Sequence, residues 1–157
     1  MVSVGASKLG KTSIFLIAPS PKVNREYYRN QILARMLPEL NDISGGAYIF
    51  QQDGARAHTA ADTIAYLAEN TPEYIVTAHW PPNSADLNPV DYSIWNELER
   101  NVHRIKKFDN IEELKEAIVE EWSNSPQERI NPCIDRFRQR CHLIIDTDGS
   151  RMEHMRK

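Results

Sequence analysis

The sequence of 157 residues contains only two cysteines and no long apolar run. Cys133 and Cys141 show no paired spacing, which is typical of reduced thiols in an intracellular protein. The longest apolar run, residues 14–18, is too short to cross a bilayer, so no membrane partner is expected. The first residues also lack the basic start and apolar core of a secretory signal peptide. Together these absences predict an intracellular protein.

Positive charge is also scarce for a protein that would bind nucleic acid unaided. The chain has 19 basic and 22 acidic residues and a formal net charge of −3 at pH 7. A self-sufficient DNA-binding module is usually basic, so composition alone does not indicate nucleic acid. If the protein acts on DNA, another domain or a metal site must supply much of the attraction. The remaining composition, 41% hydrophobic and 26% charged, is ordinary for one soluble globular domain.

The order of the expected elements predicts an α/β fold, with a mixed sheet flanked by helices and a helical C-terminal tail. β-Branched and apolar runs predict strands at 1–7, 13–18, 47–50 and 74–78, with a hairpin turn at 8–11. Helices are expected from Asn24, over 55–70, and in three segments after a proline-rich loop at 80–89.

Caps and apolar faces define these helices further. Asn24 and Asn110 are expected N-caps, and Glu113 completes a capping box with Asn110. Ser125 is expected to cap the last helix, with Pro126 at its first position. The residues expected on apolar faces are Tyr28, Ile32, Met36 and Leu40, then Trp95, Leu98, Val102 and Ile105, then Ile111, Leu114, Ile118 and Trp122, and finally Ile130, Ile134, Phe137, Cys141 and Ile144.

Two aspartates lie where expected elements begin or end. Asp53 follows the apolar strand at 47–50, and carboxylates at the C-terminal end of a strand lie on the rim where open α/β sheets bind ligands. Asp91 is expected at the third position of a helix that Asn88 caps and Pro89 begins. Carboxylates that converge from separate elements make a hard oxygen site for Mg²⁺ or Mn²⁺. Such ions can activate the attacking group and stabilise the leaving oxygen of a phosphodiester.

Each aspartate also has a structural explanation that needs no metal. An Asp-Gly pair after a strand, such as Asp53-Gly54, is a common turn. An acidic residue in the first turn of a helix, such as Asp91, commonly pairs with the helix dipole. Position alone therefore leaves both explanations open.

The sequence motifs around the two aspartates resemble those of a known protein family. Residues 51–59 read QQDGARAHT and residues 80–92 read WPPNSADLNPVDY. They resemble the second and third catalytic blocks of mariner-type DDE/D transposases and occur in the same order, and the similarity runs across nearly the whole chain. An aspartate as third acid, Asp91, resembles the mariner side of that family. Arg56 and Ala85 stand where the family often has proline, and neither replaces an acid.

The resemblance implies a ribonuclease-H-like fold and a function in DNA transposition. Asp53 and Asp91 would be catalytic ligands of Mg²⁺ or Mn²⁺, with His58 an auxiliary residue near the site or merely a first-turn residue of its helix. Arg56 could contact a DNA phosphate, with a solvated arginine as the alternative. DNA would be the partner, a homodimer the full-length form, and the nucleus the place of action.

One part of the family pattern is not found in the sequence. The family's first catalytic aspartate lies on a central strand, whereas residues 1–25 contain no acidic side chain and Glu26 is the first. We therefore expect residues 1–146 to be an N-terminally truncated catalytic domain, and 147–157 a polar tail. The strands at 1–7 and 47–50 then either pair directly or leave unpaired edges that weaken the chain. DNA cleavage by this chain alone is expected to be impaired.

A rival motif lies near the start. Residues 5–12 read GASKLGKT and match the phosphate-binding pattern G-x-x-x-x-G-K-[ST]. That loop requires a helix directly afterwards, so that the helix N-terminus can bind the phosphates. Residues 13–18 are β-branched and apolar, and Pro19 follows them, which indicates a strand. The motif is interpreted as a hairpin turn, and no nucleotide cofactor is expected.

A third hypothesis is a non-catalytic remnant that binds DNA or a protein. Two basic clusters could contact phosphates, although charge on a helix is usually only solvated. Their members are Arg100, Arg104, Lys106 and Lys107 in the first, and Arg136, Arg138, Arg140 and His142 in the second. Binding of this kind would be salt-sensitive and weakly sequence-specific.

Overall fold

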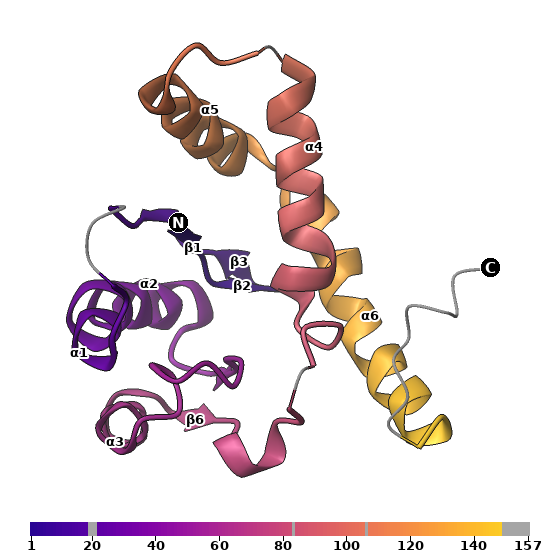
Figure 1. The fold of residues 1–157 in the computed structure, drawn as a ribbon. Helices are drawn as coiled ribbons and strands as arrows, with labels where there is room; N and C mark the ends of the chain where they lie inside the picture. Colours follow the sequence, from indigo (N-terminus) through magenta and orange to yellow (C-terminus); the bar gives the residue numbers. More distant parts are fainter. Residues whose placement is uncertain (19–21, 83, 106, 149–157) are drawn as a thin grey trace. The chain divides into compact units, whose positions relative to one another are not determined.

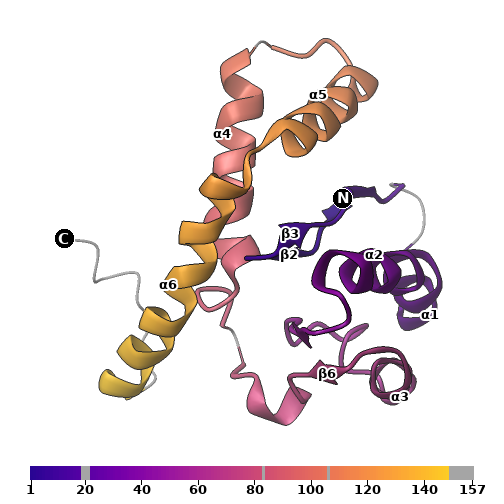
Figure 2. The same cartoon turned by 180° about the vertical axis from the view of Figure 1, so that it is seen from behind.

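A computed structural model describes residues 1–18, 22–82, 84–105 and 107–148 of the chain, shown in Figures 1 and 2. The chain divides into two compact units, Met1–Asn83 and Ser84–Lys157. The first unit holds all the described strands, and the second is helical. None of the described helices combines the length and apolar composition that a membrane crossing needs.

The strands of the first unit are short and form three pairs. β1 (Val2–Ser3) pairs antiparallel with β4 (Phe15–Leu16), and β2 (Ala6–Ser7) pairs antiparallel with β3 (Gly10–Lys11). β5 (Ile49–Phe50) pairs parallel with β6 (Glu73–Tyr74). β1 and β5 belong to different sheets, so the direct pairing considered for the strands at 1–7 and 47–50 is not found among the described residues.

The strand predicted at 1–7 is interrupted at Val4 and Gly5, because the backbone there turns toward Thr12. The N–H of Gly5 donates to Oγ1 of Thr12 at 2.8 Å, and the N–H of Thr12 donates to the carbonyl of Gly5 at 2.9 Å. A Cβ at Gly5 would lie 3.0 Å from the Thr12 methyl group. The close approach of these two segments thus leaves little room for a side chain at Gly5.

The phosphate-binding pattern at 5–12 folds as a β-hairpin, which confirms the interpretation as a turn. Lys8 and Leu9 form the turn between β2 and β3, and residues 12–14, which are not helical, lead into β4. Gly10 has a φ of +156°, and a Cβ there would lie 2.7 Å from Ile43. No helix follows the hairpin directly, so its backbone lacks the arrangement that binds phosphates.

A long helical segment packs on these strands. It runs through α1 (Arg25–Tyr27), the π-helical η1 (Tyr28–Leu33) and α2 (Ala34–Ser44). Asn24 caps it as predicted, accepting the N–H of Tyr27 at 2.8 Å, and Gly45 ends it with a φ of +62°. All four residues of its predicted apolar face are buried. The core of the unit consists of Phe15, Ile17, Tyr28, Ile32, Leu33, Met36, Leu37, Leu40, Phe50 and Leu67.

The helix predicted over 55–70 begins six residues later, as α3 (Ala61–Asn70). Residues 55–60 form turns, because local side chains bind their backbone groups. The N–H of Ala55 donates to Asp53, and the hydroxyl of Thr63 donates to the carbonyl of Ala57 at 2.8 Å. Because these side chains compete for backbone groups, the helix begins later in the sequence than predicted.

The prediction of a strand at 74–78 was also wrong in part. β6 comprises Glu73–Tyr74, and the N–H of Ile75 continues the pairing to the carbonyl of Phe50 at 2.9 Å. The chain then turns through a 3₁₀ helix, η2 (Thr77–His79). Both views show β6 beside α3 (Figures 1 and 2).

The second unit contains the π-helical η3 (Val90–Ile94) and three longer helices, α4 (Trp95–Ile105), α5 (Ile111–Asn124) and α6 (Gln127–Asp146). α5 packs against α4, while α6 runs past η3 and the start of α4 (Figures 1 and 2). The buried apolar residues of this unit are Leu87, Ile94, Leu98, Val102, Trp122, Ile130 and Cys133.

Two details of the second unit differ from the sequence predictions, and some of the predicted residues lie outside the part of the chain that the structure describes. Ile111 is 59% exposed and does not join the apolar face of α5. The last helix begins at Gln127 with Pro126 in the capping position, so the predicted cap at Ser125 was displaced by one residue. The side chain of Ile105, all of Lys106 and residues 149–157 of the predicted tail lie outside the described residues.

Candidate functional site

Asp53 lies in the first unit, three residues after the end of β5, and one of its carboxylate oxygens is held by two donors. Oδ1 accepts the N–H of Ala55 at 3.0 Å and lies 2.5 Å from Nδ1 of His58. Because an ionised carboxylate only accepts, Nδ1 of His58 is the donor of the second bond. The Asp53 side chain is 43% exposed. Within the described residues, Oδ2 has no hydrogen-bonding partner.

His58 is itself held by a buried aromatic side chain. Its ring centroid lies 4.1 Å from that of Tyr28, with the two planes tilted by 33°. The Tyr28 hydroxyl donates to Oε1 of Gln52 at 2.9 Å, and Nε2 of Gln52 donates to the carbonyl of His58 at 3.1 Å. Asp53, His58, Tyr28 and Gln52 thus form one connected cluster, called here the Asp53 cluster.

The Asp53 cluster fixes the charge states of two of its members. The hydrogen bond from His58 lowers the pKa of Asp53, partial burial opposes this, and the N–H of Ala55 lowers the pKa again. Burial raises the pKa of Tyr28, and the negative charge of Asp53 raises it further. At neutral pH, Asp53 is therefore an ionised carboxylate, and Tyr28 is a protonated hydrogen-bond donor.

Asp91 lies in the second unit, in the first helical turn after Asn88. The Asn88 carbonyl accepts the N–H of Asp91 at 3.0 Å, and its Oδ1 accepts the N–H of Val90 at 3.2 Å. Asn88 therefore caps this turn as predicted. Its side-chain amide also donates to Oδ2 of Asp91 at 3.0 Å, which orients the half-buried carboxylate.

Backbone and side-chain groups of α6 contact the turn that contains Asp91. The hydroxyl of Tyr92 donates to the backbone carbonyl of Cys133, and Oγ of Ser93 lies 3.0 Å from Sγ of Cys133. The guanidinium of Arg140 covers the Tyr92 ring and donates to the carbonyl of Asp86 at 2.8 Å. The charged group of Arg140, a member of the second basic cluster, therefore makes contacts within the protein.

The carboxylate chemistry fits a divalent cation, although the described residues do not assemble a full site. Asp53 is ionised, partly exposed and held by one oxygen, which leaves Oδ2 as a hard ligand of the type that Mg²⁺ and Mn²⁺ prefer. Asp91 offers a second oriented carboxylate. In the described part of the chain, no three His, Cys, Asp or Glu residues are grouped so that they could hold a metal ion.

The other predicted site residues differ in their placement. Arg56 is exposed in the loop after Asp53, and Arg100 and Arg104 are exposed on α4. Lys107 is exposed after that helix, and Lys106 lies outside the described residues. Sequence reasoning missed Tyr28 and Gln52 as neighbours of His58. The position of Gln52 next to Asp53 in the motif could have indicated its place in the site. The sequence pattern around Tyr28 indicated only a core residue.

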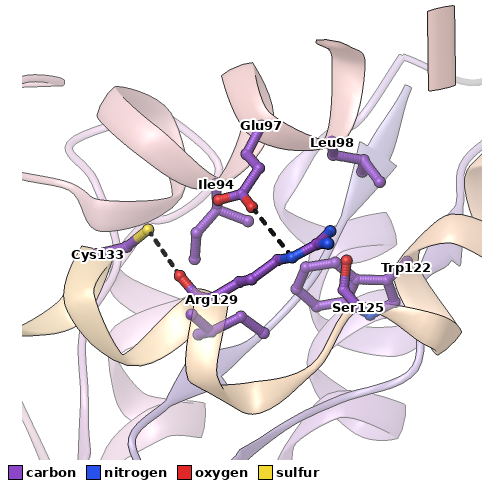
Figure 3. Close-up of a pocket in the computed structure, with 8 residues that line it drawn as sticks. Ile94, Glu97, Leu98, Trp122, Ser125, Arg129 and Cys133 are labelled. Carbon is purple, nitrogen blue, oxygen red and sulfur yellow. Dashed lines mark hydrogen bonds and ion pairs between the residues drawn. The ribbon is translucent and has the colours of Figure 1, made fainter. Parts of the chain in front are cut away.

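A small hollow in the second unit lies between α4, α5 and α6 (Figure 3). Figure 3 shows Arg129 reaching across it toward Glu97, and the two side chains are 4.0 Å apart. Arg129 also lies 3.9 Å from Glu121 of α5, so it bridges two helices. Sγ of Cys133 donates to the backbone carbonyl of Arg129 at 3.4 Å. The hollow contains none of the predicted site residues, and its charged groups serve helix packing.

Curated relatives share sequence with this chain. The Tc1 transposase of Caenorhabditis elegans is 28% identical over 127 residues, covering 81% of this chain and 45% of that protein. The Tc3 transposase of the same species is 29% identical over 132 residues, covering 83% and 39%. The Tcb2 transposase of Caenorhabditis briggsae is 26% identical over 133 residues, covering 81% and 45%. The chain thus spans less than half the length of these relatives. No protein-family profile matches it.

Solved structures share its fold. The catalytic domain of Mos1 mariner transposase superposes with a TM-score of 0.79 at 23% identity, covering 97% of this chain and 75% of that one. This chain is similar in sequence to Tc1 and Tc3 transposases and similar in fold to the catalytic domain of a mariner transposase. A Mos1 paired-end complex with the left transposon end gives a TM-score of 0.78 at 24% identity, covering 97% and 44%.

The mariner-type likeness confirms the predicted α/β, ribonuclease-H-like fold with its helical C-terminal part. It also confirms the resemblance that was inferred from the two blocks around Asp53 and Asp91. The roles of Asp53, Asp91 and His58 stay predictions, because a shared fold does not test individual side chains.

Proposed function

We propose that this mariner-type domain derives from an enzyme that cleaved DNA and transferred its strands with the help of divalent metal ions. Asp53 and Asp91 are the proposed ligands of Mg²⁺ or Mn²⁺. The observation that carries the proposal is the state of Asp53, an ionised, partly exposed carboxylate whose Oδ1 is fixed and whose Oδ2 is unpaired within the described chain.

Structures of the similar Mos1 protein support the choice of metal and of partner. Its catalytic domain has been solved with Mg and with Mn, and other Mos1 structures are a paired-end complex, a strand transfer complex and a transpososome. On that basis we propose DNA as the partner here. From the resemblance in sequence we further propose a homodimer as the full-length form and the nucleus as the place of action.

The proposed chemistry assigns simple roles to the side chains of this chain. Asp53 and Asp91 would hold a divalent ion, and that ion would supply the positive charge that helps to break and re-form phosphodiester bonds. Asp53 presents Oδ2 as a ligand while Ala55 and His58 hold Oδ1. Asn88 holds Oδ2 of Asp91 and thereby orients the second carboxylate.

Nicking of supercoiled plasmid by the purified chain, with Mg²⁺, with Mn²⁺ and with EDTA, tests the enzymatic proposal. Metal-dependent nicking that is lost in both Asp53→Ala and Asp91→Ala supports it. Asp42→Ala is the matched control, because Asp42 is an exposed acid at the end of α2. Nicking that survives in either active-site variant contradicts the assignment of that residue.

A second function, non-catalytic DNA binding, is favoured by one observation. Arg100 and Arg104 are exposed four residues apart on α4, and exposed Lys107 follows that helix. Binding through them should weaken with rising salt and in Arg104→Ala or Lys107→Ala, because each phosphate contact displaces counterions. DNA binding that persists in Asp53→Ala while nicking is absent in the wild type selects this function over catalysis.

A further inference from the structure

We propose that Tyr28 is a positioning residue for Asp53. Tyr28 fixes the ring of His58, and His58 fixes the carboxylate so that Oδ2 is presented to a divalent cation. The inference rests on the proposed function, in which Asp53 is a metal ligand. It extends the site to Tyr28, which lies in the N-terminal helix outside the Asp53 motif, and to Gln52 within the motif.

The first step is the restraint on the carboxylate. Two donors, the N–H of Ala55 and Nδ1 of His58, converge on Oδ1 of Asp53 at 3.0 and 2.5 Å. With one oxygen held, the carboxylate cannot rotate freely, although the side chain as a whole is still 43% exposed. A ligand that is ordered before the metal arrives loses less conformational entropy on binding, which favours affinity.

The second step is the restraint on His58, which lies in the turns between β5 and α3 and not in a helix or strand. Its ring lies against the tilted ring of Tyr28, with 4.1 Å between the centroids, and its side chain is only 22% exposed. Tyr28 is 5% exposed and begins the π-helical segment η1. A side chain from a turn is therefore packed against an aromatic ring of the core.

The third step is a second connection through Gln52. The Tyr28 hydroxyl donates to Oε1 of Gln52 at 2.9 Å, and Nε2 of Gln52 donates to the backbone carbonyl of His58 at 3.1 Å. Tyr28 thus holds the ring of His58 directly and its backbone through Gln52. The side-chain amide of Gln52 uses both its donor and its acceptor in this closed loop of contacts.

Tyr28 also belongs to the hydrophobic core, so the test must separate positioning from stability. Ile32 is the matched control, because it lies one turn further along the same helix, is 3% exposed and belongs to the same core. Tyr28→Leu and Ile32→Ala both weaken packing, but only the former removes the ring beneath His58. Tyr28→Phe keeps the ring and removes only the bond to Gln52.

Nuclear magnetic resonance of the full chain tests the positioning directly. In wild type and Ile32→Ala we expect a downfield, slowly exchanging Nδ1 proton of His58 that is bonded to Asp53. We expect Tyr28→Leu to lose this resonance and Tyr28→Phe to shift it. If Tyr28→Leu does not fold, Gln52→Leu replaces it, with a shifted resonance expected. An unchanged resonance in the folded variants overturns the inference.

Calorimetric Mn²⁺ titration of the same proteins tests the consequence. Outer partners of metal ligands typically change affinity by roughly 10–100-fold, so we expect about tenfold weaker binding in His58→Ala and in Tyr28→Leu. The double variant should bind no more weakly than His58→Ala alone, because Tyr28 acts through His58. Ile32→Ala should bind as the wild type does. Additive losses overturn the inference.

The Asp53→Asn variant distinguishes the proposed role of Asp53 as a metal ligand from the proposed positioning role of Tyr28. If it weakens Mn²⁺ binding while Tyr28→Leu and His58→Ala do not, the proposed metal ligand stands and the positioning role of Tyr28 is overturned. If Asp53→Asn leaves the affinity unchanged, the proposed function fails, and the positioning role fails with it.

Discussion

The guanidinium carbon of Arg140 lies 3.8 Å from the centre of the Tyr92 ring. The same group donates a hydrogen bond to the backbone carbonyl of Asp86 at 2.8 Å. A single side chain of α6 therefore contacts the segments on both sides of Asn88, the cap that orients Asp91. Arg140 stabilises the surroundings of this carboxylate from a distant part of the sequence.

Replacing Arg140 with alanine should destabilise the second unit. The variant loses a cation–π contact and a charged hydrogen bond, together about 1–3 kcal/mol of unfolding free energy. Urea denaturation measures this, with Arg138→Ala as the control, because Arg138 is exposed on the same helix and its loss should cost about 0.5 kcal/mol or less. Equal stability of the two variants contradicts the structural role of Arg140.

Removing the cap of α5 should also be measurable. Oδ1 of Asn110 accepts the N–H groups of Glu112 and Glu113, and its amide donates to the Glu113 carboxylate at 3.1 Å. Asn110→Ala should lower the unfolding free energy by about 1 kcal/mol. Asp109→Ala, at the exposed neighbouring position, is the comparison, and a loss as large as that of Asn110→Ala would contradict a specific cap.

The pH dependence of stability follows from the lowered pKa of Asp53. The unfolded chain takes up a proton on this group at a higher pH than the folded chain does. The stabilisation is therefore present above the unfolded value, about 4, and is lost as the pH falls through the folded value. Asp53→Asn should be less stable than the wild type at pH 7, and the difference should shrink below about pH 4. A difference that is constant with pH contradicts this.

The hairpin at 5–12 gives a further prediction. Gly10 has a left-handed backbone and lies against Ile43, so Gly10→Ala should destabilise the chain by about 1–3 kcal/mol. Mg·ATP should leave the melting temperature of the wild type unchanged, because the hairpin offers no helix N-terminus to the phosphates. A nucleotide-dependent rise that is lost in Lys11→Ala would revive the phosphate-binding interpretation.

Local chemistry made much of the fold predictable. Asn24, Asn88 and Asn110 cap their helices as expected, because an N-cap depends only on the next few residues. The apolar face of the first long helix is buried in full, since its spacing alone sets which side faces the core. The expected order of strands and helices holds, although the strands are shorter than their apolar runs.

The remaining features depend on contacts that sequence patterns do not show. The turns before α3 arise because side chains such as Asp53 and Thr63 bind backbone groups that a helix would have used. The sequence places Arg140 on a basic helix face, and only the fold brings its guanidinium against the Tyr92 ring. For the same reason Tyr28 read only as a core residue, because its contact with His58 joins two segments far apart in the sequence.

The central claim is that Asp53 is a metal ligand, and thermal unfolding of the full chain with and without Mn²⁺ tests it most directly. Ligand binding to the folded state alone raises the melting temperature. The account predicts that Mn²⁺ raises the melting temperature of the wild type and of Asp42→Ala, and that the rise is lost in Asp53→Asn. A wild type that unfolds cooperatively with no response to Mn²⁺, or an equal rise in Asp53→Asn, would contradict the claim.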